Sequence, residues 1–152
     1  MPITAPSADQ ADESAGARSD RAAIRHIPGV PDIGQAQAVR VGRHVFVSGQ
    51  MGLDEAGQLV GAGDCHAQAV QCFRNLTAIL HTAGAQLADV VRMVCYLTDR
   101  EDARAYAEAR AEFFDRLPAT TAVVVKELLL PDALLELDVT AVLPTPTTPP
   151  DL

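Results

Sequence analysis

The residues best suited to chemistry lie near the C-terminal end of the chain. Polar and apolar residues alternate there, in the order Glu136, Leu137, Asp138, Val139, Thr140 and Ala141. A period of two is typical of a β-strand whose two faces differ, so the polar side chains share one face. A carboxylate on such a face can accept a proton from a reacting group. Glu136 is therefore the candidate catalytic residue, although the same pattern also fits a solvated strand face.

Nucleophiles and metal ligands give weaker signals. The cysteines and histidines are scattered, at Cys65, Cys72, Cys95, His26, His44, His66 and His81. Zinc ligands usually come at short, regular spacings, so no metal site is predicted. An odd number of cysteines argues against a disulfide framework. Ser48 has no His and Asp arrangement nearby that would activate it as a nucleophile, so we interpret it as a pocket wall.

The charge balance disfavours several partners. Lys and Arg number 12 against 20 Asp and Glu, the net charge is −8, and Lys126 is the only lysine. Nucleic-acid backbones are bound by clustered cations, so no nucleic-acid partner is predicted. No apolar run approaches the roughly 18 residues of a membrane-spanning helix, so no membrane association is predicted. The N-terminal segment also lacks the features of an export signal, which favours a cytoplasmic location.

The elements that must position Glu136 begin with short strands. Residues 24–27 form a predicted first strand, and residues 38–43 and 44–48 form a predicted hairpin that turns at Gly42. Gly49 is expected to end the third strand. Residues 51–63, which are rich in glycine, are expected to form a loop.

Two helices and three further strands complete the pattern. Apolar residues three and four apart predict a helix from Asp64 to Ala83, with Gly84 at its C-terminal cap. An apolar run predicts a strand over 90–97. A second helix is predicted from about Asp99 to Leu117, where Pro118 stops it. Two strands, up to Val125 and over 135–142, are then expected to be joined by a turn near Pro131.

This order predicts an α+β fold, with one mostly antiparallel sheet and two helices on one face. The second face would carry Val90, Val94 and Tyr96, or the residues that alternate with them, beside the Glu136 row. Such a partly apolar face is usually covered by another subunit. Residues 23–143 are predicted to form the single domain, between a disordered tail at 1–22 and a proline-rich tail at 144–152.

Many short segments, taken in order, resemble the Rid family of reactive intermediate deaminases, also called YjgF-like or L-PSP endoribonuclease-like. The resemblance extends from about Ile24 to Leu143. The matching pieces are Gly34, Gln37-Ala38-Val39, Val45-Phe46-Val47-Ser48-Gly49-Gln50, Gln68, Asn75-Leu76, Ala83-Gly84, Val90-Val91, Tyr96-Leu97-Thr98-Asp99, Phe113-Phe114, Pro118-Ala119, Leu135-Glu136-Leu137 and Ala141-Val142.

The resemblance implies a chorismate-mutase-like subunit in a homotrimer, with a cleft between each pair of neighbours. It also implies hydrolysis of reactive enamines and imines without metal or cofactor. In that family, the matching Glu activates the attacking water, so the resemblance assigns this role to Glu136. Ser48, the backbone at Gly49, Thr120 and Thr121 would bind the substrate.

The sequence departs from the family where the deaminases carry an Arg that grips the substrate carboxylate. That position is Thr120 here, and a hydroxyl cannot replace a bidentate guanidinium. We therefore expect a hydrolase of enamine or imine metabolites with a substrate range different from 2-imino acids. The alternative is a trimer that binds a small metabolite without turnover, or a biosynthetic accessory protein.

Overall fold

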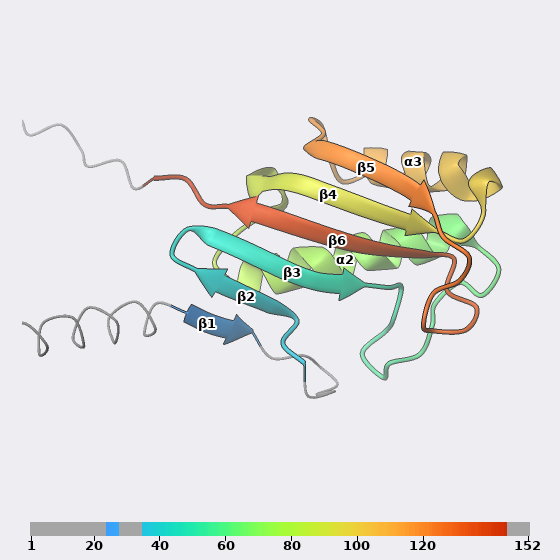
Figure 1. The fold of residues 1–152 in the computed structure, drawn as a ribbon, viewed down its shortest axis with the longest axis horizontal. Coiled ribbons are helices and arrows are strands. Elements are labelled where there is room, and N and C mark those ends of the chain that lie inside the picture. The colour runs from blue at the N-terminus through green and yellow to red at the C-terminus, as the bar shows by residue number, and fades with distance from the viewer. Residues whose placement is uncertain (1–23, 28–34, 146–152) are drawn as a thin grey trace, which may run out of the picture.

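The structure, a computed structural model, describes residues 24–27 and 35–145. In this part of the chain, six strands form one sheet in the order β1-β2-β3-β6-β4-β5. All neighbouring strands are antiparallel except β4 and β5, which are parallel. Two α-helices lie on one side of the sheet (Figure 1). The predicted α+β class with a mostly antiparallel sheet is confirmed.

The elements have the following bounds. The strands are β1 (Ile24–Ile27), β2 (Ala38–Val41), β3 (His44–Gln50), β4 (Val90–Leu97), β5 (Ala119–Val124) and β6 (Leu135–Val142). The helices are α2 (Cys65–Thr82), α3 (Ala103–Ala111) and the short 3₁₀ turns η1 (Leu87–Asp89) and η2 (Arg100–Asp102). The predicted tail at residues 1–22, and residues 146–152 of the other predicted tail, lie outside the described residues.

Strand β3 is longer than predicted. The hairpin with β2 turns as expected at Gly42, whose φ is +58°. Gly49, however, does not end β3, which continues to Gln50. A register shift between Val47 and Gln50 in the pairing with β6 accommodates Ser48 and Gly49 as a bulge. A glycine at a bulge leaves the strand able to continue.

Helix α2 begins and ends close to the predicted residues. The Asp64 side chain accepts a hydrogen bond from the backbone N–H of Ala67 at 3.0 Å, which caps the N-terminus. Gly84 follows the helix with a φ of +81°, a conformation that favours glycine. The apolar stripe of α2, with Phe73, Leu76 and Leu80 fully buried, packs on the sheet.

The second helix is shorter than predicted. It opens with η2, where Asp99 accepts a hydrogen bond from the backbone N–H of Glu101. Helix α3 then ends at Ala111 rather than near residue 117. Phe113 and Phe114 leave the helix and pack against Phe73, with ring centroids 5.2 and 5.8 Å away. This aromatic cluster takes the place of a continued helical stripe.

The last two strands are not neighbours, which corrects the expectation that a turn joins them directly. Strand β5 pairs with β4, while β6 lies between β3 and β4. Residues 125–134, rather than a tight turn near Pro131, connect the two strands. Contacts between residues far apart in the sequence decide the strand order. The periodicity of a single segment carries no information on such contacts.

The two faces of the sheet differ in burial. The helix-covered face holds the core, including Val45, Met93, Leu135 and Leu137 at 0% exposure. Val90 also belongs to the core, at 7% exposure, because the register shifts between Val90 and Arg92. The prediction that Val90 lies on the second face is wrong.

Candidate functional site

Glu136 lies on the sheet face opposite the helices. Its strand neighbours Leu135 and Leu137 are fully buried in the core, so strand alternation directs Glu136 to the open face. The register with β4 places Tyr96 across from Glu136 and Val94 across from Asp138. The two carboxylates are two residues apart along β6, which separates their Cα atoms by about 7 Å.

Gly49 makes room for the Glu136 carboxylate. A Cβ added at Gly49 would overlap Glu136 Oε1 and lie 2.8 Å from Glu136 Cδ. Gly49 has no positive φ, so this close approach, rather than backbone strain, accounts for a glycine here. The Glu136 side chain, from β6, thus lies across the backbone of β3 at Gly49. Of the predicted site residues, the structure brings these two together.

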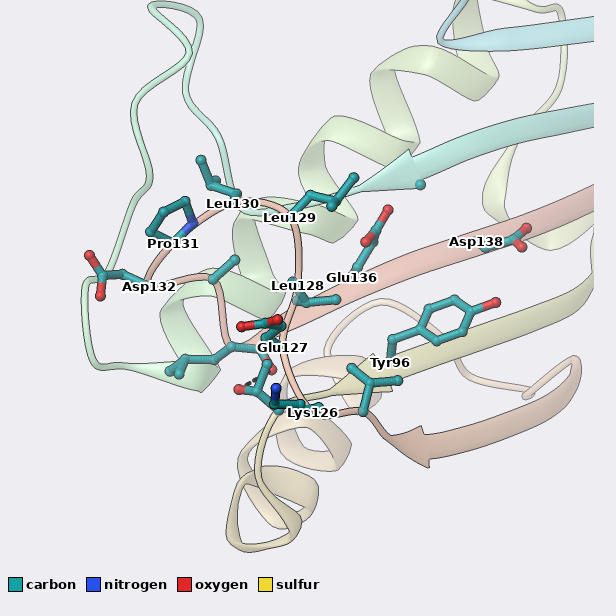
Figure 2. Close-up of a pocket in the computed structure, with 15 residues that line it drawn as sticks. Tyr96, Lys126, Glu127, Leu128, Leu129, Leu130, Pro131, Asp132, Glu136 and Asp138 are labelled. Carbon is teal, nitrogen blue, oxygen red and sulfur yellow. Dashed lines mark hydrogen bonds between the residues drawn. The ribbon is translucent and has the colours of Figure 1, made fainter.

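A cleft of about 920 Å³ opens beside Glu136. Figure 2 shows Glu136 and Asp138 projecting from β6 and Tyr96 from β4, with Leu128 and Leu129 on the loop beside them. The lining residues are Gly49, Tyr96, Thr98, Val125, Lys126, Glu127, Leu128, Leu129, Leu130, Pro131, Asp132, Ala133, Leu134, Glu136 and Asp138. Most of the cleft wall is therefore the connection between β5 and β6.

A buried glutamine holds this connection in place. The Gln68 side chain has no exposed surface, and its Nε2 donates hydrogen bonds to the carbonyls of Asp132 (3.0 Å) and Gly61 (3.2 Å). Its Oε1 accepts a hydrogen bond from the backbone N–H of Leu134 at 2.8 Å. Helix α2 thereby positions the loop in which Asp132 adopts a φ of +65°.

The electrostatics of the site suit a proton acceptor. Partial burial, and secondarily the charge of Asp138, raises the pKa of Glu136 above its ordinary value. A carboxylate with a raised pKa is a stronger base than an exposed glutamate. Lys126 is the only Lys or Arg that lines the cleft, against Glu127, Asp132, Glu136 and Asp138.

Ser48, Thr120 and Thr121 do not line this cleft. The Ser48 hydroxyl donates a hydrogen bond to the carbonyl of Ala36 at 2.7 Å and so ties β3 to the preceding segment. Thr121 pairs with Val94 and shares the open face with Asp138. Thr120 pairs with Met93 on the helix-covered face, and its hydroxyl donates to the carbonyl of Pro118 at 3.0 Å.

The sequence did not point to the loop residues of the cleft. Three consecutive leucines, Leu128 to Leu130, precede Pro131, and Leu129 is fully exposed. Exposed apolar runs often mark binding surfaces, so this run was an available signal. Lys126 is the only lysine, and its rarity in the sequence does not predict that it lines the cleft.

The cysteines do not add a nucleophile. All three are free and buried. Burial raises the pKa of the Cys65 thiol and of the Cys95 thiol to about 12, so both are protonated at neutral pH. Within residues 24–27 and 35–145, no group of three His, Cys, Asp or Glu side chains is placed to hold a metal ion. Nor is any described helix long and apolar enough to cross a membrane.

Comparison with known proteins identifies the family. A family model described as Endoribonuclease L-PSP matches residues 33–143. The chain belongs to this family, which is also called the Rid or YjgF-like family. The recognition made from the sequence motifs is thus confirmed.

Relatives of this Rid-family chain include RutC family proteins and a protein named as an imine deaminase. A RutC family protein of Pyrococcus abyssi is 40% identical over 108 residues, which are 70% of this chain and 84% of the relative. A protein of Dermatophagoides farinae named 2-iminobutanoate/2-iminopropanoate deaminase is 34% identical over 94 residues, 61% of this chain and 73% of the relative. Among solved structures, RidA of a Psychrobacter species superposes with a TM-score of 0.69 at 32% identity, covering 80% of this chain and 98% of that one.

Proposed function

We propose that this protein hydrolyses the C=N bond of reactive imines, or of the enamines that tautomerise to them. The observation that carries the proposal is the Glu136 carboxylate held over Gly49 at the edge of a 920 Å³ cleft. Membership of the Rid family and the similarity to a protein named as an imine deaminase support the same chemistry.

Glu136 acts as the general base in this proposal. Its carboxylate takes a proton from a water molecule as the water oxygen attacks the imine carbon. The proton then passes to the substrate nitrogen and gives a carbinolamine. The hydroxyl proton of the carbinolamine moves to nitrogen as the C–N bond breaks, and a carbonyl product and ammonia leave. The raised pKa of Glu136 favours the removal of the proton from water, and no step calls for a metal or cofactor.

The substrate range should differ from that of enzymes specialised for 2-imino acids. Thr120, at the position where the deaminases carry an Arg, has its hydroxyl directed to Pro118. No Arg lines the cleft. A carboxylate-bearing substrate would therefore lack the charge-assisted, two-pronged hydrogen bond that a guanidinium supplies.

The proposed assembly is a homotrimer in which neighbouring subunits complete each cleft. The open face of the sheet supports this proposal, because Phe46 and Val123 on it are 49% and 41% exposed. Side chains of that size on one face favour burial by a second copy of the chain.

The test is the hydrolysis of imines generated in situ by an oxidase, with the uncatalysed rate subtracted. The native protein should release ammonia faster than Glu136→Gln, by on the order of a hundredfold or more. Glu55→Gln, which removes one exposed carboxylate that does not line the cleft, is the matched control and should match the native rate. Equal rates for the native protein and Glu136→Gln would contradict the proposal.

A binding role without turnover makes a different prediction. A metabolite that only binds would raise the melting temperature by mass action and yield no ammonia. That result would favour the alternative of a metabolite-binding or accessory protein.

A further inference from the structure

We propose that the substrate is a carboxylate-free imine that binds as its iminium cation and carries an apolar substituent. This inference rests on the proposed function and names the substrate class of the same site. Three observations support the inference: the charge within the cleft, the positions of the arginines, and the leucine-rich loop.

The charges that one copy of the chain brings to the cleft are mainly negative. Glu136 and Asp138 project from the same face of β6, and Glu127 lies on the loop next to Lys126 (Figure 2). Asp132, at the far end of the loop, projects away from them (Figure 2). Three carboxylates against one ammonium leave a net negative field at the Glu136 carboxylate. An anion there meets like charge, whereas a cation is attracted.

Three arginines of the described residues, Arg92, Arg43 and Arg40, do not offset the negative charge of the cleft. Arg92 pairs with Thr140 and so lies four strand positions from Tyr96, about 13 Å along β4. Arg43 lies at the opposite end of β3 from Gly49, and its Nε donates to the carbonyl of Leu143 at 2.8 Å. Arg40 donates hydrogen bonds to the carbonyls of Gly42 and Ala83. None of them lines the cleft.

The loop supplies an apolar wall to the same cleft. Leu128, Leu129, Leu130 and Pro131 follow one another, and Tyr96 of β4 lines the same cleft. Leu129 is 100% exposed, which is unfavourable in water unless another apolar group covers it. A volume of about 920 Å³ admits a ligand well above the size of a three-carbon imine. An alkyl or aryl substituent of the substrate fits this wall.

The chemistry of an iminium cation matches these groups. Water attacks the carbon of R–CH=NH₂⁺, Glu136 takes a proton from that water, and the same proton passes to nitrogen. The C–N bond then breaks and the departing ammonia takes the hydroxyl proton, which gives R–CHO and NH₄⁺ with no change of oxidation state. Such cations arise by two-electron oxidation of primary amines, so the reaction that supplies the substrate belongs to that class. Elimination from amino acids would instead supply 2-imino acids.

The experiment compares two imines that differ in the carboxylate. An amine oxidase with oxygen forms the imine of n-hexylamine, and an amino-acid oxidase forms the 2-imino acid from norleucine. We expect kcat/KM for the first to exceed that for the second by at least about tenfold. Asp138→Asn and Glu127→Gln should each narrow this ratio by severalfold, while the control Glu55→Gln should leave it unchanged. Faster hydrolysis of the 2-imino acid would overturn the inference and leave the proposed function standing.

A binding measurement separates the two proposals. Hexylammonium and hexanoate, which cannot be hydrolysed, are titrated into the native protein and into Asp138→Asn by calorimetry. Preferential binding of hexylammonium that weakens in Asp138→Asn supports the inference, even if no imine is turned over and the proposed function fails. Equal or tighter binding of hexanoate overturns it.

Discussion

At the scale of single residues, the site depends on one close contact between two strands. The Glu136 carboxylate occupies the space where a side chain at Gly49 would begin. Because Glu136 can rotate away while the backbone of β3 stays in place, this contact positions a reactive group more than it stabilises the fold. Substitutions at these two residues should therefore separate activity from stability.

Gly49→Ala should abolish most of the activity with little loss of stability. The added methyl group displaces the Glu136 carboxylate, and misplacing a catalytic group by about 1 Å can cost on the order of a hundredfold in rate. The atoms it meets belong to a flexible side chain, so the free energy of unfolding should fall by no more than about 1 kcal/mol. Steady-state kinetics and urea unfolding measure the two effects. In a Glu136→Gln background, Gly49→Ala should add no further loss of activity; a large additional loss would contradict the contact.

Glu136→Gln should stabilise the protein at neutral pH and not at low pH. The folded-state pKa of Glu136 is raised, so its contribution to stability is fully present below the unfolded pKa of about 4.3 and is lost as the pH rises through the folded pKa. Glutamine stays uncharged at every pH, so the variant does not lose stability in this way. The melting temperature of the variant should exceed that of the native protein at pH 7, and the difference should shrink toward pH 4. A difference that is independent of pH would show that charge is not its cause.

At the scale of elements, one helix side chain positions the cleft wall. Gln68 of α2 makes three hydrogen bonds to the backbone of two loops, and these bonds hold the connection from β5 to β6 against the helix. Backbone hydrogen bonds from Val125 to Leu97 (2.8 Å) and from Thr98 to Leu134 (3.0 Å) fix the two ends of that connection to β4. The loop is thus tied to β4 at both ends, and Gln68 adds two hydrogen bonds at its C-terminal end.

Gln68→Ala should destabilise the fold and disorder the loop. The substitution removes the side-chain partner of the Asp132 carbonyl and of the Leu134 N–H, which costs about 2–4 kcal/mol in total. The melting temperature should fall by on the order of 5–10 °C for a chain of this size. Amide exchange of residues 125–134 should accelerate more than that of the core strands. Gln58→Ala is the control, because Gln58 is exposed and no hydrogen bond of its side chain is observed; an equal loss there would contradict the role of Gln68.

At the scale of the whole molecule, the sheet presents one covered and one open face. The helices bury the first face, whereas the second combines the carboxylates with exposed apolar side chains such as Phe46 and Val123. The proposed trimer would cover part of the open face and give each cleft a second wall. Site and assembly would then depend on the same surface.

Phe46→Asp should therefore dissociate the assembly and reduce activity. Sedimentation of the native protein should give close to three times 16.1 kDa, and the variant should sediment as a monomer. A carboxylate at this position is compatible with the monomer fold, because Phe46 is 49% exposed in the single chain. Leu117→Asp, in the connection between α3 and β5 with 48% exposure, is a matched control outside the sheet. A native protein that is monomeric at micromolar concentration would contradict the proposed assembly.

Local patterns in the sequence determined most of the elements. Alternation over residues 135–142 indicated β6, and spacing of three and four residues with Asp64 and Gly84 at the ends indicated α2. These features depend on the conformation of neighbouring residues and on caps within one turn, so a single sequence contains them. The ordered family motifs, from Ile24 to Leu143, likewise sufficed to recognise the Rid family.

The tertiary structure alone decided how the site is assembled. Strand order placed β6 between β3 and β4, which brought Gly49 and Tyr96 to Glu136. It also put Thr120 on the other sheet face and the leucine loop beside the carboxylates. Each of these relations joins residues distant in the chain, through strand pairing and through the buried Gln68. Periodicity describes one element at a time, so it could identify Glu136 as a candidate but not the groups that surround it.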